Sequence, residues 1–331
     1  MTADRRLARV LELLDAAHGP TVHAFPATPT PWASTYALAA GDTRLVARLI
    51  APELAEEPVV RTEFEAARLL GENGIGPRVR LADVAAGVLV MDRVDGSPVR
   101  PAAPWQALSL AQVLRRLHSV EPPGGPRLHV RKRVEASAAV AELVAHVPRL
   151  AVYGEAADRF DALRGALRTL GTEDRLCHND LNPGNILFDS SRAWLIDFDH
   201  LGTGDPLFDV ATATLSLGMD EELGARFVAA YLGRPATAAE SARLELLSCL
   251  VLLRYGLSAL SLVPGGLRDR LGGWTAETVG EPFVFDHRAD GELGWSVFRL
   301  SLAFVHAGLA RADAAPATRA AAALGLLGAS V

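Results

Sequence analysis

Three short stretches in the first third of the chain group apolar residues in the way that β-strands do. They are Ser34–Leu38, Thr43–Ile50 and Gly87–Met91. Between the second and the third, residues from Val59 to Glu72 repeat their apolar positions with a helical period. We therefore expect a small mixed lobe of strands and one helix between about Ala33 and Val94.

The pattern becomes mostly helical after Gly96-Ser-Pro98, beginning with the stretch from Gln106 to His118. It stays helical for most of the remaining chain. This change predicts two units. Residues 1–94 are expected to form an N-terminal lobe that begins with a helix, and residues 95–331 a larger, mainly α-helical lobe.

One segment of the larger lobe breaks the helical pattern. Its two short apolar runs, Asn185–Phe188 and Ala193–Ile196, are separated by Asp189-Ser-Ser-Arg192, a combination typical of a tight turn. This predicts a β-hairpin. Such a hairpin sets Asn185, at the start of one strand, beside Asp197, at the end of the other.

Side chains around this hairpin suit phosphoryl transfer. Mg²⁺ prefers a few hard oxygen ligands, so Asn185 and Asp197 can share the ions that bridge the phosphates of ATP or GTP. Asp180, on the loop before the hairpin, is placed to accept the proton of an attacking hydroxyl as a general base. The pattern H-x-D-L-x-x-x-N followed by D-F is the catalytic-loop and metal-loop pair of kinases. A kinase that uses Mg²⁺ and a nucleoside triphosphate is the leading hypothesis.

The same residues also have structural interpretations. The segment Asp-Leu-Asn-Pro-Gly-Asn, residues 180–185, can be a plain turn whose side chains bond to their own backbone. The complete constellation, with an apolar hairpin between two metal ligands, favours catalysis over that alternative. For His178 the balance is reversed. Beside Cys177 in an apolar context, it is expected to be a buried histidine that orders the loop by hydrogen bonds, and not a proton carrier.

At these residues the chain resembles the aminoglycoside phosphotransferase and choline kinase superfamily, the small-molecule branch of the protein-kinase-like fold. The resemblance rests on His178–Asp197 and on Gly204–Ala211, which reads G-D-P-L-F-D-V-A. It implies an α+β, bilobal fold with a small N-terminal mixed β-sheet lobe, a larger helical lobe that carries the hairpin, and a nucleotide in the crevice between them. It also implies that Asp209 lies at a helix start and supports the catalytic loop. Asp205, before a proline, can be only a turn residue.

The resemblance requires a cation that holds phosphate. The only lysine, Lys132, lies well inside the second lobe, so the lysine of the third kinase strand is replaced. Arg48, which follows the alternating residues Leu45-Val-Ala47, stands where that lysine should be, and Arg44, nearer the start of the strand, is the competitor. A guanidinium can grip phosphate oxygens in a bidentate way. The acidic partner on the following helix is expected to be Glu65, which fits the family's E-A-x-x-L pattern better than Glu63. Solvation at the surface is the alternative for each of them.

Two further segments are expected to contact the nucleotide. Thr30–Tyr36 falls where a Gly-rich phosphate loop belongs but has no glycine, so Ser34 and Thr35 are expected to offer backbone N–H groups and hydroxyls. Met91, Asp92 and Val94 belong to the expected hinge between the lobes, whose backbone contacts the adenine edge. A buried strand end is the alternative for Met91.

The motif spacing also bears on the acceptor. Asp197-Phe-Asp199 lacks the glycine of D-F-G, and only eleven residues separate Asp197 from Asp209, which leaves no room for an activation segment. A protein kinase is therefore disfavoured. The expected acceptor is a hydroxyl of a small molecule: an aminoglycoside or other antibiotic, or an amino alcohol or other metabolite. Asp199 can touch metal or substrate, or be structural. A nucleotide-binding regulatory pseudokinase remains the alternative, because the phosphate loop lacks glycine and Arg48 replaces lysine.

Charge in the second lobe suits a cationic acceptor. Residues 201–331 carry 14 Asp and Glu against 10 Arg, a local net charge of −4. A quaternary ammonium group would want an aromatic cage, for which five residues are available, although their intervals fit core packing better: Trp274, Phe283, Phe285, Trp295 and Phe298. The chain ends without the carboxylate cluster often found in the family's aminoglycoside enzymes, which argues against a typical aminoglycoside pocket.

Overall charge and the termini exclude several other classes. The net charge of −6 and the lack of basic runs beyond Arg131-Lys-Arg133 argue against nucleic acid as a partner. The sequence contains no run of about 18 apolar residues, so no membrane span is expected. The start carries charges and a helical stripe of Leu7, Val10, Leu11 and Leu14 in place of a signal-peptide core, so a cytoplasmic enzyme is expected. Cys177 and Cys249 have no zinc spacing and are expected to be core thiols. From Ala310 an Ala-rich helix is expected, with Pro316 near its start.

Overall fold

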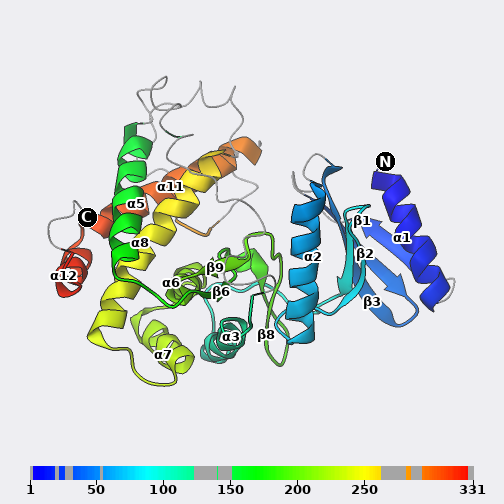
Figure 1. The fold of residues 1–331 in the computed structure, drawn as a ribbon, viewed down its shortest axis with the longest axis horizontal. Coiled ribbons are helices and arrows are strands. Elements are labelled where there is room, and N and C mark those ends of the chain that lie inside the picture. The colour runs from blue at the N-terminus through cyan, green and yellow to red at the C-terminus, as the bar shows by residue number, and fades with distance from the viewer. Residues whose placement is uncertain are drawn as a thin grey trace.

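The structure is a computed structural model that describes residues 3–18, 22–26, 33–52, 55–122, 140, 151–261, 281–284 and 293–326 (Figure 1). A sheet with two helices stands beside a larger, mainly helical part, so the predicted α+β bilobal fold is confirmed. The expected division at residues 94 and 95 falls in the segment that joins these two parts. As a domain boundary it stays a prediction.

The sheet has five strands, and every pairing in it is antiparallel. In spatial order they are β1 (Val22–Pro26), β2 (Ala33–Ala40), β3 (Thr43–Ile50), β5 (Val88–Asp92) and β4 (Val79–Asp83). The sequence predicts β2, β3 and β5 and misses β1 and β4. Each missed strand is only five residues long and lies at an edge of the sheet. In β4 no position is fully buried, which weakens the apolar signal.

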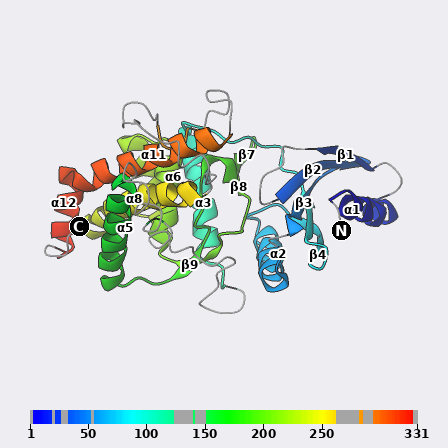
Figure 2. The same cartoon turned by 90° about the horizontal axis from the view of Figure 1, so that it is seen from above.

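Two helices cover opposite faces of this sheet, α1 (Ala3–His18) and α2 (Glu57–Glu72) (Figure 2). Side chains of α1 pack with alternate residues of β3, Leu45, Ala47 and Leu49. Because side chains alternate across a strand, Arg48 points to the other face, toward α2. The alternation of β3 therefore places a cation on the side of the sheet that faces the helical part.

The helical part is built from seven α-helices among the described residues, a short 3₁₀ turn and two small β-ribbons. The helices are α3 (Pro104–Leu117), α5 (Ala151–Thr169), α6 (Pro206–Ser216), α7 (Glu221–Leu232), α8 (Ala238–Ser261), α11 (Leu293–Asp313) and α12 (Ala315–Ala323). The 3₁₀ turn is η3 (Pro183–Asn185), and the ribbons pair β6 (Arg175–Cys177) with β9 (Gly202–Gly204) and β7 (Ile186–Phe188) with β8 (Ala193–Leu195).

The C-terminal helix differs from its prediction. Ala310 lies inside α11, which continues to Asp313, and a separate helix, α12, starts at Ala315. Pro316 is in the first turn of α12, where its missing N–H costs nothing. A run of alanines favours helix throughout and so hides the break.

Glycines bring α8 and α11 into close contact. A Cβ at Gly256 would come within 2.6 Å of the Val305 side chain, and a Cβ at Gly308 within 2.7 Å of Leu253. Ser301 also donates a hydrogen bond of 2.6 Å to the Gly256 carbonyl. This contact fixes the height and rotation of α8, and thus the direction of Tyr255, which precedes Gly256.

Among the residues that the structure describes, no helix has both the length and the apolar character needed to cross a membrane.

Candidate active site

The predicted hairpin is present, with Ile186 opposite Leu195. Asp189 closes its turn: the carboxylate accepts hydrogen bonds from the N–H groups of Ser191 and Arg192 at 2.7 and 2.8 Å, and from the Trp194 indole at 2.6 Å. Burial alone would raise the pKa of Asp189, but these donors hold the pKa below its usual range. The turn is therefore built around an ionised carboxylate.

The hairpin brings the two predicted metal ligands to adjoining strand ends. Ile196, the residue before Asp197, donates its N–H to the Asn185 carbonyl at 3.1 Å. The Asn185 side-chain nitrogen donates to the backbone carbonyl and to Oδ2 of Asp180, at 2.9 and 3.0 Å. Because the amide nitrogen is used in this way, the amide oxygen is the atom of Asn185 that can bind a cation.

Asp209 anchors the backbone of the catalytic loop from α6, and its side chain is fully buried. Its carboxylate accepts from the N–H groups of His178 and Asn179 at 2.6 and 2.8 Å, and from the His118 ring at 3.2 Å. Burial alone would raise the pKa of Asp209, but the bond and the charge interaction with His118 keep it below its usual range. The residue that follows this anchored pair is Asp180.

The two anchored residues hold the loop by their side chains as well. His178 is fully buried; its Nδ1 accepts from the Asp180 N–H at 3.3 Å, so its Nε2 donates to the Ile196 carbonyl at 3.0 Å. Asn179 has φ of +64°, a conformation that asparagine tolerates better than most residues. Its amide nitrogen donates to three backbone carbonyls at 3.1 to 3.2 Å, those of Cys177, His200 and Gly202.

The carboxylate of Asp180 receives three side-chain hydrogen bonds. Oδ1 accepts from the Tyr255 hydroxyl at 2.7 Å, and Oδ2 accepts from the side-chain nitrogens of Asn182 and Asn185 at 3.1 and 3.0 Å. Arg254, the neighbour of Tyr255 on α8, donates to the carbonyl before Asp180. A carboxylate with three donors is fixed in direction.

Arg48 bridges the sheet and the hairpin. Its Nη1 lies 2.8 Å from Asp197 Oδ1, and its Nε lies 3.5 Å from Glu63 Oε1. Burial alone would lower the pKa of Arg48, but Asp197 and then Glu63 attract its charge and raise the pKa above its usual range. The competitor Arg44 instead pairs at the surface with Asp95, at 2.8 Å.

The prediction that Glu65 on α2 is the partner of Arg48 is wrong. Glu65 is exposed, whereas Glu63 is only 3% exposed and lies beside Arg48. The buried positions of α2 include Val60, Phe64, Ala67 and Leu70, and Glu63 falls within this stripe. Two residues along a helix correspond to a rotation of about 200°, so Glu65 must face away.

Asn185 and Asp197 fit a hard divalent cation. Asp197 has φ of +63°. Its Oδ1 is paired with Arg48 at 2.8 Å, so the other carboxylate oxygen, Oδ2, is the one to offer a cation. A carboxylate and an amide oxygen are the donors that Mg²⁺ prefers. The residues present therefore suit Mg²⁺ better than a softer metal.

The expected phosphate loop is only partly described. Residues 30–32 lie outside the described residues, while Ser34 and Thr35 belong to β2 and not to a loop. Thr35 lies directly opposite Arg48 in the pairing with β3. Their predicted place in a loop is wrong, because the β2–β3 ladder extends through both residues. Their contact with phosphate stays a prediction.

The expected hinge lies at the end of β5, and part of its backbone is already used. The N–H of Asp92 donates to the Arg78 carbonyl and that of Arg93 to the Arg44 carbonyl, both at 2.9 Å. The Asp92 carboxylate binds Arg80 at 2.6 Å. These two N–H groups therefore cannot contact adenine. The expected contacts to adenine are left to the carbonyl groups of this segment and to the residues around Met91 and Val94.

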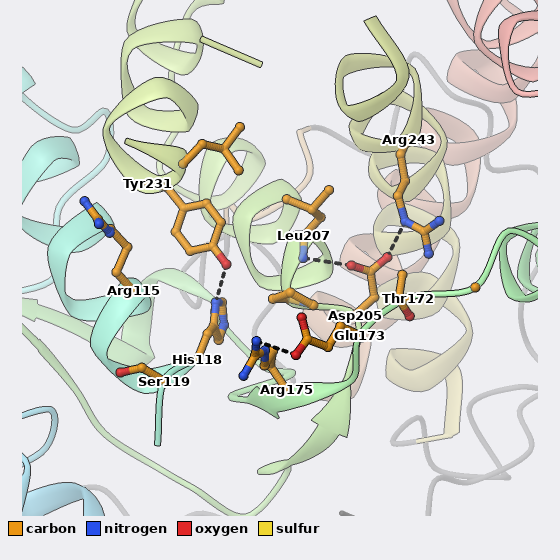
Figure 3. Close-up of a pocket in the computed structure, with 13 residues that line it drawn as sticks. Arg115, His118, Ser119, Thr172, Glu173, Arg175, Asp205, Leu207, Tyr231 and Arg243 are labelled. Carbon is orange, nitrogen blue, oxygen red and sulfur yellow. Dashed lines mark hydrogen bonds and ion pairs between the residues drawn. The ribbon is translucent and has the colours of Figure 1, made fainter. Parts of the chain in front are cut away.

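A hollow of about 510 Å³ opens elsewhere, between α3, α6, α7 and α8 (Figure 3). Two of its arginines are paired inside it, Arg175 with Glu173 and Arg243 with Asp205. None of the expected site residues lines it. Asp205 is there as the N-cap of α6 and accepts from the Leu207 N–H at 3.0 Å, in agreement with a structural role.

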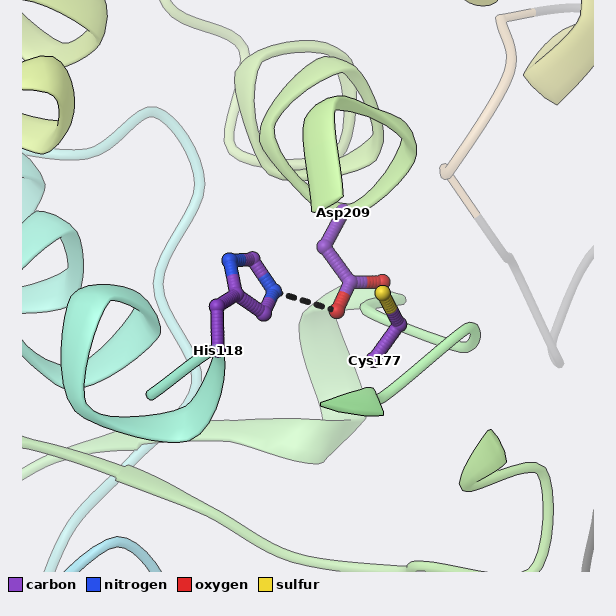
Figure 4. Close-up of side chains that lie close together, drawn as sticks. All are labelled: His118, Cys177 and Asp209. Carbon is purple, nitrogen blue, oxygen red and sulfur yellow. Dashed lines mark hydrogen bonds and ion pairs between the residues drawn. The ribbon is translucent and has the colours of Figure 1, made fainter. Parts of the chain in front are cut away.

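The floor of this hollow is connected to the catalytic loop. The Tyr231 hydroxyl lies 2.8 Å from His118 Nδ1, and His118 Nε2 donates to Asp209. Cys177 lies close to His118 and Asp209 (Figure 4). Its thiol is directed at the carbonyls of Arg175 and Gly204, at 3.4 Å. Because each group has a hydrogen-bond partner, this cluster is a structural support rather than a metal site.

Two aromatic rings pack against Tyr255, the tyrosine that binds Asp180. Tyr255 stacks on Phe304 with centroids 5.3 Å apart, and Phe283 meets Tyr255 edge to face at 5.2 Å. One of the five residues considered for an aromatic cage, Phe298, is buried beside Tyr153. For Phe298 the prediction of core packing is therefore confirmed. Trp274 and Phe285, and the side chain of Trp295, lie outside the described residues.

Sequence reasoning missed Arg254 and Tyr255, because they lie on α8, 75 residues from the groups that they bind. No local motif connects them to the hairpin. One signal was present: Arg-Tyr interrupts the otherwise apolar run of α8, and a polar pair in a buried helix usually has a partner.

Comparison with known proteins agrees with this geometry. The family model described as "Phosphotransferase enzyme family" matches residues 31–247. The curated protein LicA of Haemophilus influenzae is 53% identical over 38 residues, which are 12% of this chain and 14% of the length of LicA. That match is local and leaves most of LicA without a counterpart.

Solved structures match over nearly the whole chain. A choline/ethanolamine kinase family protein from Mesorhizobium loti aligns with a TM-score of 0.70 at 18% identity, over 96% of this chain and 99% of the other. Choline kinase LicA from Streptococcus pneumoniae aligns with a TM-score of 0.62 at 15% identity, over 92% and 99%. The ADP-bound aminoglycoside phosphotransferase APH(2'')-Ib aligns with a TM-score of 0.57 at 14% identity, over 90% and 98%.

Proposed function

Since this chain belongs to the phosphotransferase enzyme family, we propose that it is a small-molecule kinase, which transfers the γ-phosphoryl group of ATP or GTP to a hydroxyl of a small cationic molecule with Asp180 as the general base. The observation that carries the proposal is the carboxylate of Asp180. It is held by three donors at 2.7 to 3.1 Å, and one of these donors is Asn185, a proposed metal ligand.

The transfer needs one base and one electrophile. The acceptor oxygen attacks the γ-phosphorus while its proton passes to Asp180, the bond between the γ-phosphorus and the bridging oxygen breaks, and the nucleoside diphosphate leaves. The hydrogen bonds to Asp180 restrict its rotation, so the base keeps its direction through this step.

The nucleotide side of the site is proposed to depend on Arg48. Its guanidinium, already held by Glu63 and Asp197, has donors to spare for phosphate oxygens. Asn185 and Asp197 would hold Mg²⁺, which neutralises charge on the phosphates when it is bound. Thr35 lies opposite Arg48 and is proposed to contact phosphate. The hinge around Met91 and Val94 is proposed to contact the base.

The acceptor side is acidic. Asp199 is 8% exposed, and its carboxylate lies within 4.8 Å of Asp180. Two neighbouring carboxylates favour an acceptor with a positive charge near its hydroxyl. The similar structures named above include choline or ethanolamine kinases and an aminoglycoside phosphotransferase, so amino alcohols and aminoglycosides are the first acceptor classes to test.

The experiment is release of ADP or GDP in the presence of Mg²⁺ with a panel of choline, ethanolamine, aminoglycosides, other hydroxylated antibiotics, thiamine and sugars. We expect one class to stimulate release and Asp180→Asn to abolish it. Asp158→Asn, a change of the same kind at an exposed position on α5, is the matched control. Stimulation that persists in Asp180→Asn would refute the role of Asp180, and no stimulation by any member would refute the proposed acceptor classes.

A further inference from the structure

The two oxygens of Asp180 are not equivalent. Oδ2 accepts from two amide nitrogens, those of Asn182 and Asn185, at 3.1 and 3.0 Å. Oδ1 accepts from one group among the described residues, the Tyr255 hydroxyl at 2.7 Å. A carboxylate oxygen has about two acceptor sites. Oδ2 is therefore saturated, and the single acceptor site that remains is on Oδ1, beside Tyr255.

Tyr255 can act here only as a donor. The ionised carboxylate has no proton to give, so the short bond runs from the phenol to Asp180. Burial, and then the negative charge of Asp180, raise the pKa of Tyr255 well above its usual value. The hydroxyl consequently keeps its proton over the whole range in which enzymes are assayed.

The ring of Tyr255 packs against two phenylalanine rings. It stacks on Phe304, which is 2% exposed, and Phe283 lies edge to face against both rings, at 5.2 and 4.8 Å. Phe283 has φ of +61°, which is costly for a bulky residue. In the described part of the chain only Asn179 and Asp197 share this conformation without being glycine, and both belong to the candidate site.

The helix that carries Tyr255 also binds the loop directly. Arg254 donates to the Asn179 carbonyl, the peptide group that precedes Asp180. The close contact of Gly256 with Val305 fixes α8 at this level. Consecutive residues of one helix therefore hold the backbone and the side chain of Asp180 at the same time.

We propose that Tyr255 is a positioning residue: its hydroxyl fixes Asp180 Oδ1 so that the remaining acceptor site of that oxygen meets the acceptor hydroxyl. The proposal deepens the proposed function, because it rests on Asp180 being the base. It makes Oδ1, and not Oδ2, the atom that receives the proton. The acceptor hydroxyl then approaches next to the Tyr255 phenol.

Tyr255→Phe removes only the hydroxyl and keeps the ring stack. Tyr153→Phe is the matched control, because Tyr153 is also buried and its hydroxyl lies 2.8 Å from Ser301 Oγ, in the core between α5 and α11. The two variants lose the same atom, each from a hydrogen bond of nearly the same length. Only one of these bonds reaches the proposed base.

The kinetic test measures two reactions: phosphoryl transfer to the panel member with the highest turnover, and hydrolysis of ATP by water. We expect Tyr255→Phe to lower kcat about tenfold, equal to about 1.4 kcal/mol, with less than about a threefold change in the acceptor KM and in the affinity for MgADP. Tyr153→Phe should keep the kcat of the wild type. The ratio of wild-type to Tyr255→Phe rates should stay constant from about pH 6 to about pH 9, because Tyr255 does not ionise there.

A second measurement needs no acceptor. Crystal structures of the wild type and of Tyr255→Phe should differ at Asp180. In the variant the carboxylate should be turned about Oδ2, which keeps its two amide donors. An Asp180 that does not move, or a wild-type kcat in Tyr255→Phe, would overturn the proposal. Equal losses of kcat in both tyrosine variants would also overturn it, since that result indicates stability alone. Full activity of Asp180→Asn would instead refute the proposed function on which it rests.

Discussion

Replacing Glu63 by Gln tests the cation that we assign to the phosphates. Glu63 is 3% exposed and lies 3.5 Å from Arg48 Nε. The variant keeps the shape of the side chain and removes its charge. Arg48 is then attracted mainly by Asp197, at 2.8 Å, and more weakly by Asp199. Without the charge of Glu63, the guanidinium is drawn toward Asp197 and is held less firmly in the position from which its remaining donors reach phosphate.

The size of the effect follows from the geometry. At 3.5 Å and an effective dielectric constant of about 20, two unit charges attract each other by about 5 kcal/mol before desolvation is deducted. Desolvation of a buried pair removes much of this attraction, and Asp197 still neutralises Arg48 in the variant. We therefore expect a loss of about 1 to 3 kcal/mol in nucleotide binding, which is from about fivefold to about 150-fold in Kd.

The assay is titration calorimetry of MgADP and of a non-hydrolysable MgATP analogue, with the melting temperature measured alongside. Glu65→Gln is the matched control, because it makes the same chemical change on α2 at an exposed position two residues away. We expect the control to bind as the wild type does. A folded Glu63→Gln protein whose Kd lies within about twofold of the wild type, or equal weakening by both variants, would refute the role of the Arg48–Glu63 pair.

Two other predictions concern buried groups. Asp209→Asn should lower the free energy of unfolding by about 3 kcal/mol at neutral pH, because an amide cannot replace both carboxylate oxygens that face His178 and Asn179. The pKa of Asp209 is depressed in the folded protein, so its contribution is present above about pH 4 and lost as the pH falls through the folded-state value. Urea titrations of wild type and variant should therefore converge in acid, and equal stability at pH near 7 would contradict this. Burial raises the pKa of Cys249 to about 12, so its thiol should resist Ellman's reagent at about pH 8 until the protein unfolds. Labelling of Cys249 in the folded protein would contradict that.

The sequence predicted the parts of the site that are close together in the chain. Asp180, Asn185 and Asp197 lie within one loop and hairpin, whose turn residues and short apolar runs are local signals. Arg48 also lies in a strand with a local alternating signal, and the structure places it beside Glu63 of α2. The choice between Glu63 and Glu65 was also local, yet it was made on a family pattern. The helical stripe of α2, Val60, Phe64, Ala67 and Leu70, would have decided it.

The rest depends on contacts between distant segments. Tyr255 meets Asp180 only because glycines let α8 and α11 approach each other, a packing detail with no periodic signal. The support of Asp209 by His118 joins residues 91 positions apart. Strands β1 and β4 were missed for a different reason. Both are short strands at an edge of the sheet, and β4 has no fully buried position, so its alternation fades.

The most direct test of the central claim is detection of the transferred phosphoryl group itself. Phosphorus NMR, with Mg²⁺, ATP and the stimulating member of the panel, should show a phosphomonoester that grows as the γ-phosphate signal declines. It should be absent without Mg²⁺ and in Asp180→Asn, and present in Asp158→Asn. Inorganic phosphate as the sole product, or a phosphomonoester formed by Asp180→Asn at the wild-type rate, would contradict the assignment of Asp180 as the base of a small-molecule kinase.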